Sequence, residues 1–139
     1  MLSTATFKRG LHKGLFTLWE MTKIVIPVYV AVTFLKYTPV LDWIIKACAP
    51  VMGLFGLSGE AAVPLVLGNV LNLYAAIGAL TSLPLAPREI TILAIMLLIS
   101  HNLLVESAVS GRTGVNGLVM GGFRLGLSFF CGFLLNLLW

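Results

Sequence analysis

Two groups of polar residues interrupt the apolar parts of this chain. The first lies in the segment Gly56-Leu-Ser-Gly-Glu-Ala-Ala-Val-Pro-Leu-Val-Leu-Gly-Asn-Val-Leu-Asn-Leu-Tyr74, which carries a carboxylate, two asparagines, a proline and several glycines. Polar groups and helix breakers inside a membrane-length apolar run are costly, so they usually line a cavity or a site. The segment therefore predicts a polar feature inside a membrane, and it leaves open what that feature handles.

The spacing within this segment places its polar side chains on one helical face. Glu60, Pro64, Gly68 and Asn72 are four residues apart, and Asn69 lies close to the same stripe on an unbroken helix. A face of this kind suits a helix contact or a cavity wall better than lipid. An interhelical hydrogen-bond network with no substrate is the alternative, and the spacing alone does not decide between them.

The second polar group follows a nearly pure apolar run. Asn102 and Glu106 are four residues apart and would share a face, with His101 about 100° away on the helical wheel. We expect these side chains to meet groups from 57–83 or from a second copy of the chain, although a lone histidine is often only a packing residue. A carboxylate at this depth needs a partner. Arg112 and Arg124 are the available cations, and an ion pair or snorkelling is the preferred interpretation of both.

No pattern in the chain supports catalysis or metal binding. It has no His-x-x-x-His, no Gly-x-Ser-x-Gly and no Walker loop. Two thiols cannot make a zinc site alone, and Cys48 and Cys131 lie in apolar surroundings typical of structural cysteines. We therefore expect no enzyme, no metal and no cofactor.

Composition sets the solvent in which these residues act. Of 139 residues, 59% are hydrophobic and 10% are charged, and soluble domains usually have about 25% charged residues. So short a chain cannot bury this much apolar surface in one water-facing core, which predicts an all-α integral membrane protein. The net charge of +4 is too small and dispersed to indicate nucleic acid binding.

The predicted elements belong to one membrane domain spanning residues 1–139. Residues 1–23 predict an interfacial amphipathic helix, and 24–56 predict kinked membrane or interfacial helices, with a kink at Pro27 and a break at Pro50. Residues 57–83 are long enough to span, but Gly68-Asn69 could instead form the turn of a re-entrant hairpin.

The C-terminal part predicts two clear transmembrane helices, at 88–109 and 115–139, the second containing the small-xxx-small pairs Gly117/Gly121 and Gly122/Gly126. Basic residues favour one side of the membrane by five to three, whether 57–83 spans or turns back. We expect a multi-pass protein of the bacterial cytoplasmic (inner) membrane with a cytoplasmic N-terminus. Because the margin is small, a dual topology stays open.

The polar segments resemble a known family. Gly56-Leu-Ser-Gly-Glu-Ala-Ala-Val-Pro-Leu65, Gly68-Asn-Val-Leu-Asn-Leu-Tyr-Ala-Ala-Ile-Gly78, Ser100-His-Asn-Leu-Leu-Val-Glu106 and Gly111-Arg-Thr-Gly114 are similar to the nucleoside-recognition or gate domain family. The family includes small bacterial spore maturation membrane proteins, and its domains also occur in nucleoside and ferrous iron transporters. The resemblance runs from Pro27 to the last span.

The resemblance implies a substrate site built from broken helices. Ser58, Gly59 and Glu60 would mark a hairpin tip, Asn69 and Asn72 its interior, and His101, Asn102 and Glu106 the facing helix. The chain is about one gate repeat long, so it would form half of an inverted-repeat, transporter-like architecture. The other half would come from a second copy or from a homologous gate-domain chain.

These observations predict a subunit of an oligomeric, transporter-like membrane protein. It would bind or move a small polar solute, nucleoside-like or anionic, at a subunit interface, with a helix N-terminus at Ser58-Gly59 favouring an anionic group. The expected partners are membrane lipid, the solute and a second gate unit, with no nucleic acid. The alternatives are a non-transporting assembly module and a lipid-handling membrane protein.

Overall fold

The computed structural model describes residues 4–35 and 37–139, apart from the side chains of residues 4, 5 and 112. Every regular element in this part is helical, which confirms the predicted all-α integral membrane fold. Three helical segments are long and apolar enough to cross a bilayer: Thr6–Leu35, Pro87–Gly111 and Gly117–Leu138. The elements are α1 (Thr4–Leu35), α2 (Pro39–Gly53), the 3-10 turn η1 (Gly59–Ala61), α3 (Ala62–Val70), α4 (Leu73–Ser82), α5 (Pro87–Ser100), α6 (Leu103–Arg112) and α7 (Gly117–Leu138).

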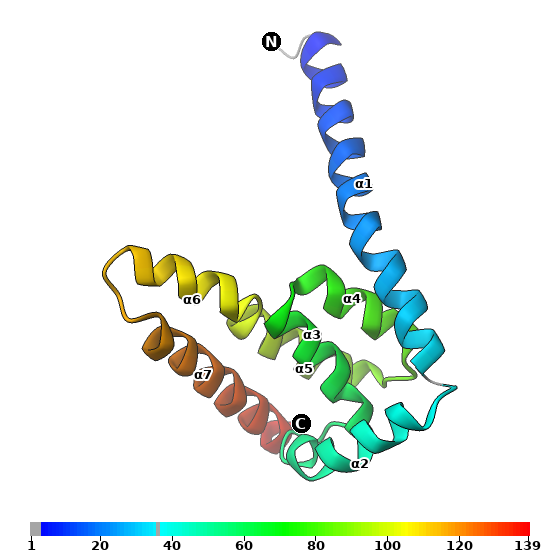
Figure 1. Cartoon of the computed structure of the whole chain (residues 1–139), viewed down its shortest axis with the longest axis vertical. Coiled ribbons are helices and arrows are strands. Elements are labelled where there is room, and N and C mark those ends of the chain that lie inside the picture. The colour runs from blue at the N-terminus through cyan, green and yellow to red at the C-terminus, as the bar shows by residue number, and fades with distance from the viewer. Residues whose placement is uncertain (1–3, 36) are drawn as a thin grey trace.

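The N-terminal half of the chain has fewer breaks than we expected. α1 is one continuous helix of 32 residues, about 48 Å long, with no boundary between residues 23 and 24. Its first part projects away from the other helices, and its second part packs against α4 (Figure 1). Pro27 lies inside α1, and Pro50 lies inside α2 without ending it. A proline removes one helical hydrogen bond, and packing against neighbouring helices compensates for that loss.

Residues 57–83 form a hairpin and not a span. α3 and α4 have nine and ten residues and are each about 15 Å long, half of the hydrocarbon thickness. They pack against each other, and the turn lies at Leu71–Asn72 instead of Gly68-Asn69. Asn72 sets this position because its Oδ1 accepts the Ala75 N–H at 3.0 Å as the N-cap of α4.

Gly68 lies inside α3 and is a tight packing contact. A Cβ atom there would lie 2.5 Å from Leu97 Cδ2 and 3.0 Å from the Ala76 Cβ. The hairpin also divides the predicted stripe, because Asn72 lies beyond the end of the helix that carries Pro64 and Gly68. The four residues therefore do not share one face.

The predicted helix at 88–109 is interrupted. α5 ends at Ser100 and α6 begins at Leu103, and Asn102 between them has a left-handed backbone with φ 59°. Asparagine is one of the few residues other than glycine that adopts this conformation at small cost. The segment thus contains a built-in helix break.

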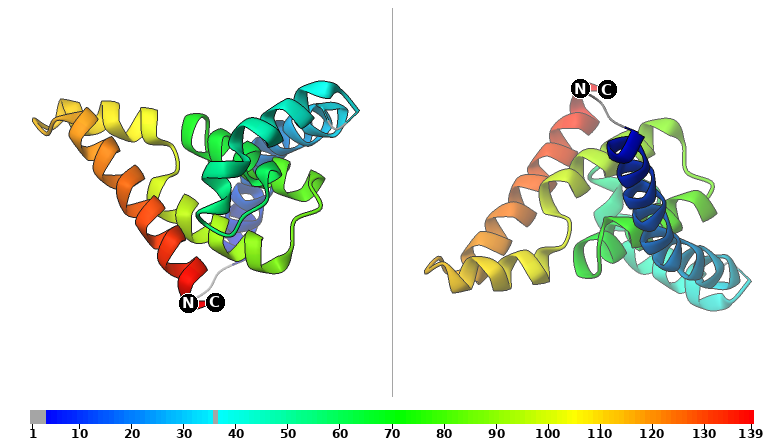
Figure 2. Two further views of the ribbon diagram at one scale, coloured as in Figure 1. Left: turned by 90° about the horizontal axis from the view of Figure 1, so that it is seen from below. Right: turned by 90° about the horizontal axis from the view of Figure 1, so that it is seen from above.

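The core surrounds α5. Ile92, Leu93, Met96 and Leu97 are fully buried against α3 and α7. The hydroxyl of Ser128 on α7 donates to the Met96 carbonyl at 2.9 Å, which fixes α7 along α5. Figure 2 shows the hairpin of α6 and α7 extending to one side of the body formed by α3–α5, while α2 and the end of α1 that joins it extend to the other. The break in α5–α6 therefore lies at the junction between the body and this hairpin.

Candidate functional site

The structure separates the predicted site residues into two groups. Ser58, Gly59 and Glu60 precede α3, while Asn69 and the residues after it lie at or beyond its other end. The nine residues of α3 hold the groups about 13 Å apart. A single small solute does not contact both groups within one copy of the chain.

The first group belongs to an anchored loop. The Ser58 N–H donates to Glu89 Oε1 at 2.6 Å, and Glu89 Oε2 accepts the Ala86 N–H at 2.8 Å. A carboxylate of the chain itself thus occupies the position where we expected an anionic solute group. Gly59 packs against the backbone of Ile45, and Glu60 is half-buried with no hydrogen-bond or ion-pair partner among the described residues.

Sequence reasoning missed the residues that anchor this loop. Arg88 donates to the Gly56 carbonyl at 3.2 Å and to Asn136 Oδ1 at 2.8 Å, and Asn136 Nδ2 donates to the Leu54 carbonyl at 3.2 Å. The available signal was Pro87-Arg88-Glu89 at the start of an apolar helix, where a glutamate commonly accepts backbone N–H groups. These residues tie the loop to the start of α5 and to the end of α7.

The second group lies where the two helix breaks meet. The backbone N–H of Asn102 donates to the Gly68 carbonyl at 2.9 Å. This bond joins the last turn of α3 to the first turn of α6, so the negative end of one helix dipole faces the positive end of another. The predicted meeting of 100–106 with 57–83 therefore occurs through the backbone, and the Asn102 side chain makes no helix cap.

His101 and Glu106 face each other beside this crossing. His101 Nδ1 lies 2.9 Å from the Leu97 carbonyl oxygen, and because a carbonyl can only accept, Nδ1 carries the hydrogen. The other ring nitrogen, Nε2, lies 3.8 Å from Glu106 Oε1. In the neutral imidazole Nε2 is an acceptor. Two acceptors thus face each other across a gap too wide for a hydrogen bond.

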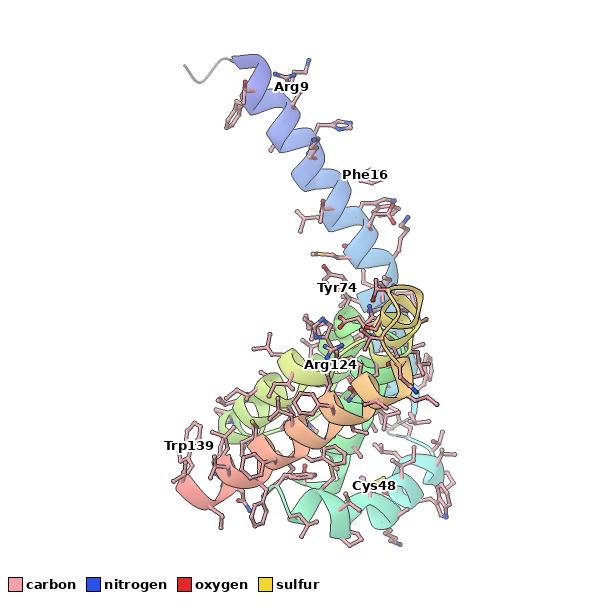
Figure 3. All side chains as sticks on the ribbon, turned by 90° about the vertical axis from the view of Figure 1, so that its left-hand side faces the viewer. Arg9, Phe16, Cys48, Tyr74, Arg124 and Trp139 are labelled. Atoms are coloured by element: carbon pink, nitrogen blue, oxygen red, sulfur yellow. The ribbon has the colours of Figure 1, made fainter. Side chains whose placement is uncertain are left out.

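Arg124, on α7, contacts both helices at the break between α5 and α6 (Figure 3). Its Nη1 pairs with Glu106 Oε2, its Nε donates to the Ile99 carbonyl at 2.9 Å, and its Nη2 lies 3.5 Å from the His101 carbonyl oxygen. The last carbonyls of a helix have no intrahelical donor, and the guanidinium supplies one. The preferred ion pair is therefore present for Arg124, whereas the side chain of Arg112 lies outside the described part.

Asn69 lines a cavity on another side of α3. The cavity has a volume of about 400 Å³ and lies between α2, α3 and α7, with walls that include Met52, Leu103 and Phe129. Asn69 is 8% exposed and its Nδ2 donates to the Leu65 carbonyl at 2.8 Å, but its buried Oδ1 has no partner among the described atoms. Its amide is therefore only half satisfied.

Comparison with known proteins agrees with this architecture. The model of the family described as "Nucleoside recognition" matches residues 18–124, which include both helix breaks and Arg124. The chain belongs to the Gate family. The family resemblance of the polar segments is confirmed, and the Gate family is associated with nucleoside transporters and other membrane proteins.

Two curated proteins match this chain over part of their own length. The chain is 48% identical over 133 residues to the uncharacterized membrane protein YvoD of Bacillus subtilis, and this match covers 96% of the chain and 43% of YvoD. It is 42% identical over 62 residues to the inner membrane protein YjiG of Escherichia coli, and this match covers 45% of the chain and 40% of YjiG. The chain thus spans less than half the length of the curated relatives it matches. No solved structure matches it.

Proposed function

We propose that this chain is one gate unit of a membrane transporter, and that a small polar solute binds where its two helix breaks meet. The observation that carries the proposal is the hydrogen bond from Asn102 to the Gly68 carbonyl, which places the His101–Glu106 acceptor pair at the crossing. Broken helices at membrane depth are tolerated where they are buried in protein or line a cavity, and in transporters they form substrate sites.

The geometry favours a solute that donates hydrogen bonds. His101 Nε2 and Glu106 Oε1 are both acceptors, while the donors of Arg124 already contact Glu106 and the carbonyls of Ile99 and His101. Hydroxyl and amine groups, such as those of a nucleoside, satisfy two such acceptors. An anionic solute is disfavoured here, because two acceptors offer an anion no hydrogen bond.

A second gate unit would complete the site. The side chains of His101 and Glu106 are 31% and 43% exposed, so one copy does not enclose a solute. The unit would be a second copy or a homologous chain, and YvoD is more than twice as long as the segment that this chain matches. The assembly would lie in a bacterial inner membrane with the N-termini in the cytoplasm, where Lys8 and Lys13 on the projecting part of α1 would meet anionic headgroups.

Uptake by proteoliposomes containing the purified chain tests this proposal. A panel of labelled nucleosides and other small polar metabolites would be offered, and we expect at least one to enter the vesicles. Glu106→Gln should reduce its uptake at least ten-fold with the oligomer intact by crosslinking. Glu20→Gln is the matched control, because Glu20 forms an exposed ion pair with Lys23 on α1. Glu60→Gln should also leave uptake unchanged, since α3 separates Glu60 from the crossing.

A second candidate function is a membrane assembly module that transports nothing. It is favoured by the bonding already complete inside the chain: Asn72 caps α4, Asn102 bonds to α3, and Glu106 pairs with Arg124. In that case Glu106→Gln weakens the oligomer, and the wild-type chain moves no solute from the panel. That pair of results would exclude the transporter proposal.

A further inference from the structure

The gap between His101 and Glu106 has the chemistry of a proton site. The Leu97 carbonyl accepts the Nδ1 hydrogen, which leaves Nε2 with a lone pair, and a carboxylate oxygen of Glu106 lies 3.8 Å from it. Two lone pairs facing each other repel, and a hydrogen between them turns the repulsion into a charge-assisted hydrogen bond. The arrangement is therefore incomplete until a proton or another donor enters it.

We infer that the His101–Glu106 pair binds the proton that is coupled to solute movement, which rests on the proposed function. The proton adds to the Nε2 lone pair, and the new Nε2–H donates to Glu106 Oε1. No bond within the protein breaks, and the proton leaves from the same lone pair toward the other side of the membrane. The solute and the proton then use one acceptor pair, so occupancy by one alters the binding of the other.

A metal cation fits this position less well than a proton. In the described part of the chain, no group of three or more His, Cys, Asp or Glu side chains could hold a metal ion. Sodium would require several oxygen ligands, whereas the gap offers one imidazole nitrogen and one carboxylate oxygen. A proton needs only these two atoms.

The charges around the His101–Glu106 pair allow it to bind and release a proton. Glu106 from α6 and Arg124 from α7 neutralise each other, and α3, which meets α6 at the crossing, carries no ionisable side chain. The cluster is thus neutral with His101 neutral and carries one positive charge with the proton bound. Because Arg124 stays bonded to the Ile99 carbonyl, proton binding changes the charge of the cluster without removing the cation that covers the α5 terminus.

Nitrogen NMR of the full chain in lipid nanodiscs tests the proton site without any solute. With ¹⁵N-labelled histidine, we expect His101 at alkaline pH to have hydrogen on Nδ1 alone. At acidic pH it should gain a hydrogen-bonded Nε2–H, and this bond should disappear in Glu106→Gln. His12, which is exposed on α1, is the internal control. A His101 whose hydrogen resides on Nε2 at alkaline pH, or an Nε2–H unchanged by Glu106→Gln, would overturn the inference.

Uptake under a pH gradient is the second test of the inference. With a nucleoside from the panel as the probe, an acid-inside pH gradient should raise uptake about ten-fold over uptake without a gradient, because solute and proton exclude each other from one acceptor pair and solute entry is then coupled to proton exit. His101→Gln should abolish this increase, whereas His12→Gln should preserve it. A response to a sodium gradient and none to pH refutes proton coupling while leaving the proposed function intact. If no panel solute moves, the proposed function fails, and the NMR result still decides whether the pair binds a proton.

Discussion

Arg124 should stabilise the helix break through two separable contributions. Its Nε donates to the Ile99 carbonyl at 2.9 Å, and its Nη1 pairs with Glu106. A hydrogen bond from a charged donor contributes about 1.5–3 kcal/mol. The ion pair contributes about 1 kcal/mol, because the Glu106 side chain is 43% exposed and its charge is partly screened. We therefore expect Arg124→Met to lower the free energy of unfolding by about 3 kcal/mol.

A double-mutant cycle separates the two contributions. Glu106→Gln alone should cost about 1 kcal/mol, and the double variant should cost little more than Arg124→Met, with a coupling energy of about 1 kcal/mol. Arg124→Lys keeps the charge but loses the planar donor geometry, so it should recover only part of the loss. Unfolding in mixed micelles, followed by circular dichroism, measures the wild type and these four variants.

Two results would refute this reasoning. If the single costs add without coupling, the Arg124–Glu106 pair contributes nothing to stability. If Arg124→Met is neutral, the carbonyls at the end of α5 do not need the guanidinium, and the break is held by the Asn102–Gly68 bond alone. Glu20→Gln, which removes the exposed pair with Lys23, is the control and should cost at most about 0.5 kcal/mol.

Three further predictions test other parts of the fold. Gly117→Ala should lower the free energy of unfolding by about 2 kcal/mol, because its Cβ would collide with the Ser107 carbonyl oxygen. Gly122→Ala on the same helix is the control, since its Cβ meets nothing within 4 Å and the change should be neutral or slightly stabilising. Equal costs for the two variants would contradict the packing of α6 on α7. Asn102→Gly should preserve stability because the backbone φ at this position is 59°. Asn102→Val should lower the free energy of unfolding by about 1–2 kcal/mol. Equal stabilities of the two variants would show that the helix break does not require a residue suited to the left-handed conformation. Glu89→Gln should speed hydrogen exchange of the Ser58 amide about ten-fold by weakening the 2.6 Å bond, and unchanged exchange would show that the loop is held by Arg88 and Asn136 instead.

The sequence determined the class of protein and where its expensive polar groups lie. Composition required lipid as the solvent, because so short a chain cannot bury its apolar residues alone. The motifs around Glu60 and His101 indicated the family, and the apolar lengths correctly predicted two C-terminal segments that could cross a membrane, although the first of them is interrupted before α6. Each of these conclusions depends on residue type and local spacing, which are complete in the sequence.

Only the tertiary structure decided which polar groups meet. Helical periodicity assigned Asn72 to the face of Glu60, but Asn72 instead ends the hairpin turn as a cap, and α3 holds Glu60 away from His101. The predicted place for an anionic solute contains Glu89, which lies 31 residues from Ser58. A helix breaks where a distant group can satisfy its freed backbone atoms, as Gly68 does for Asn102 and Arg124 for Ile99. Such partners are fixed by packing between helices, so no local pattern in the sequence reveals them.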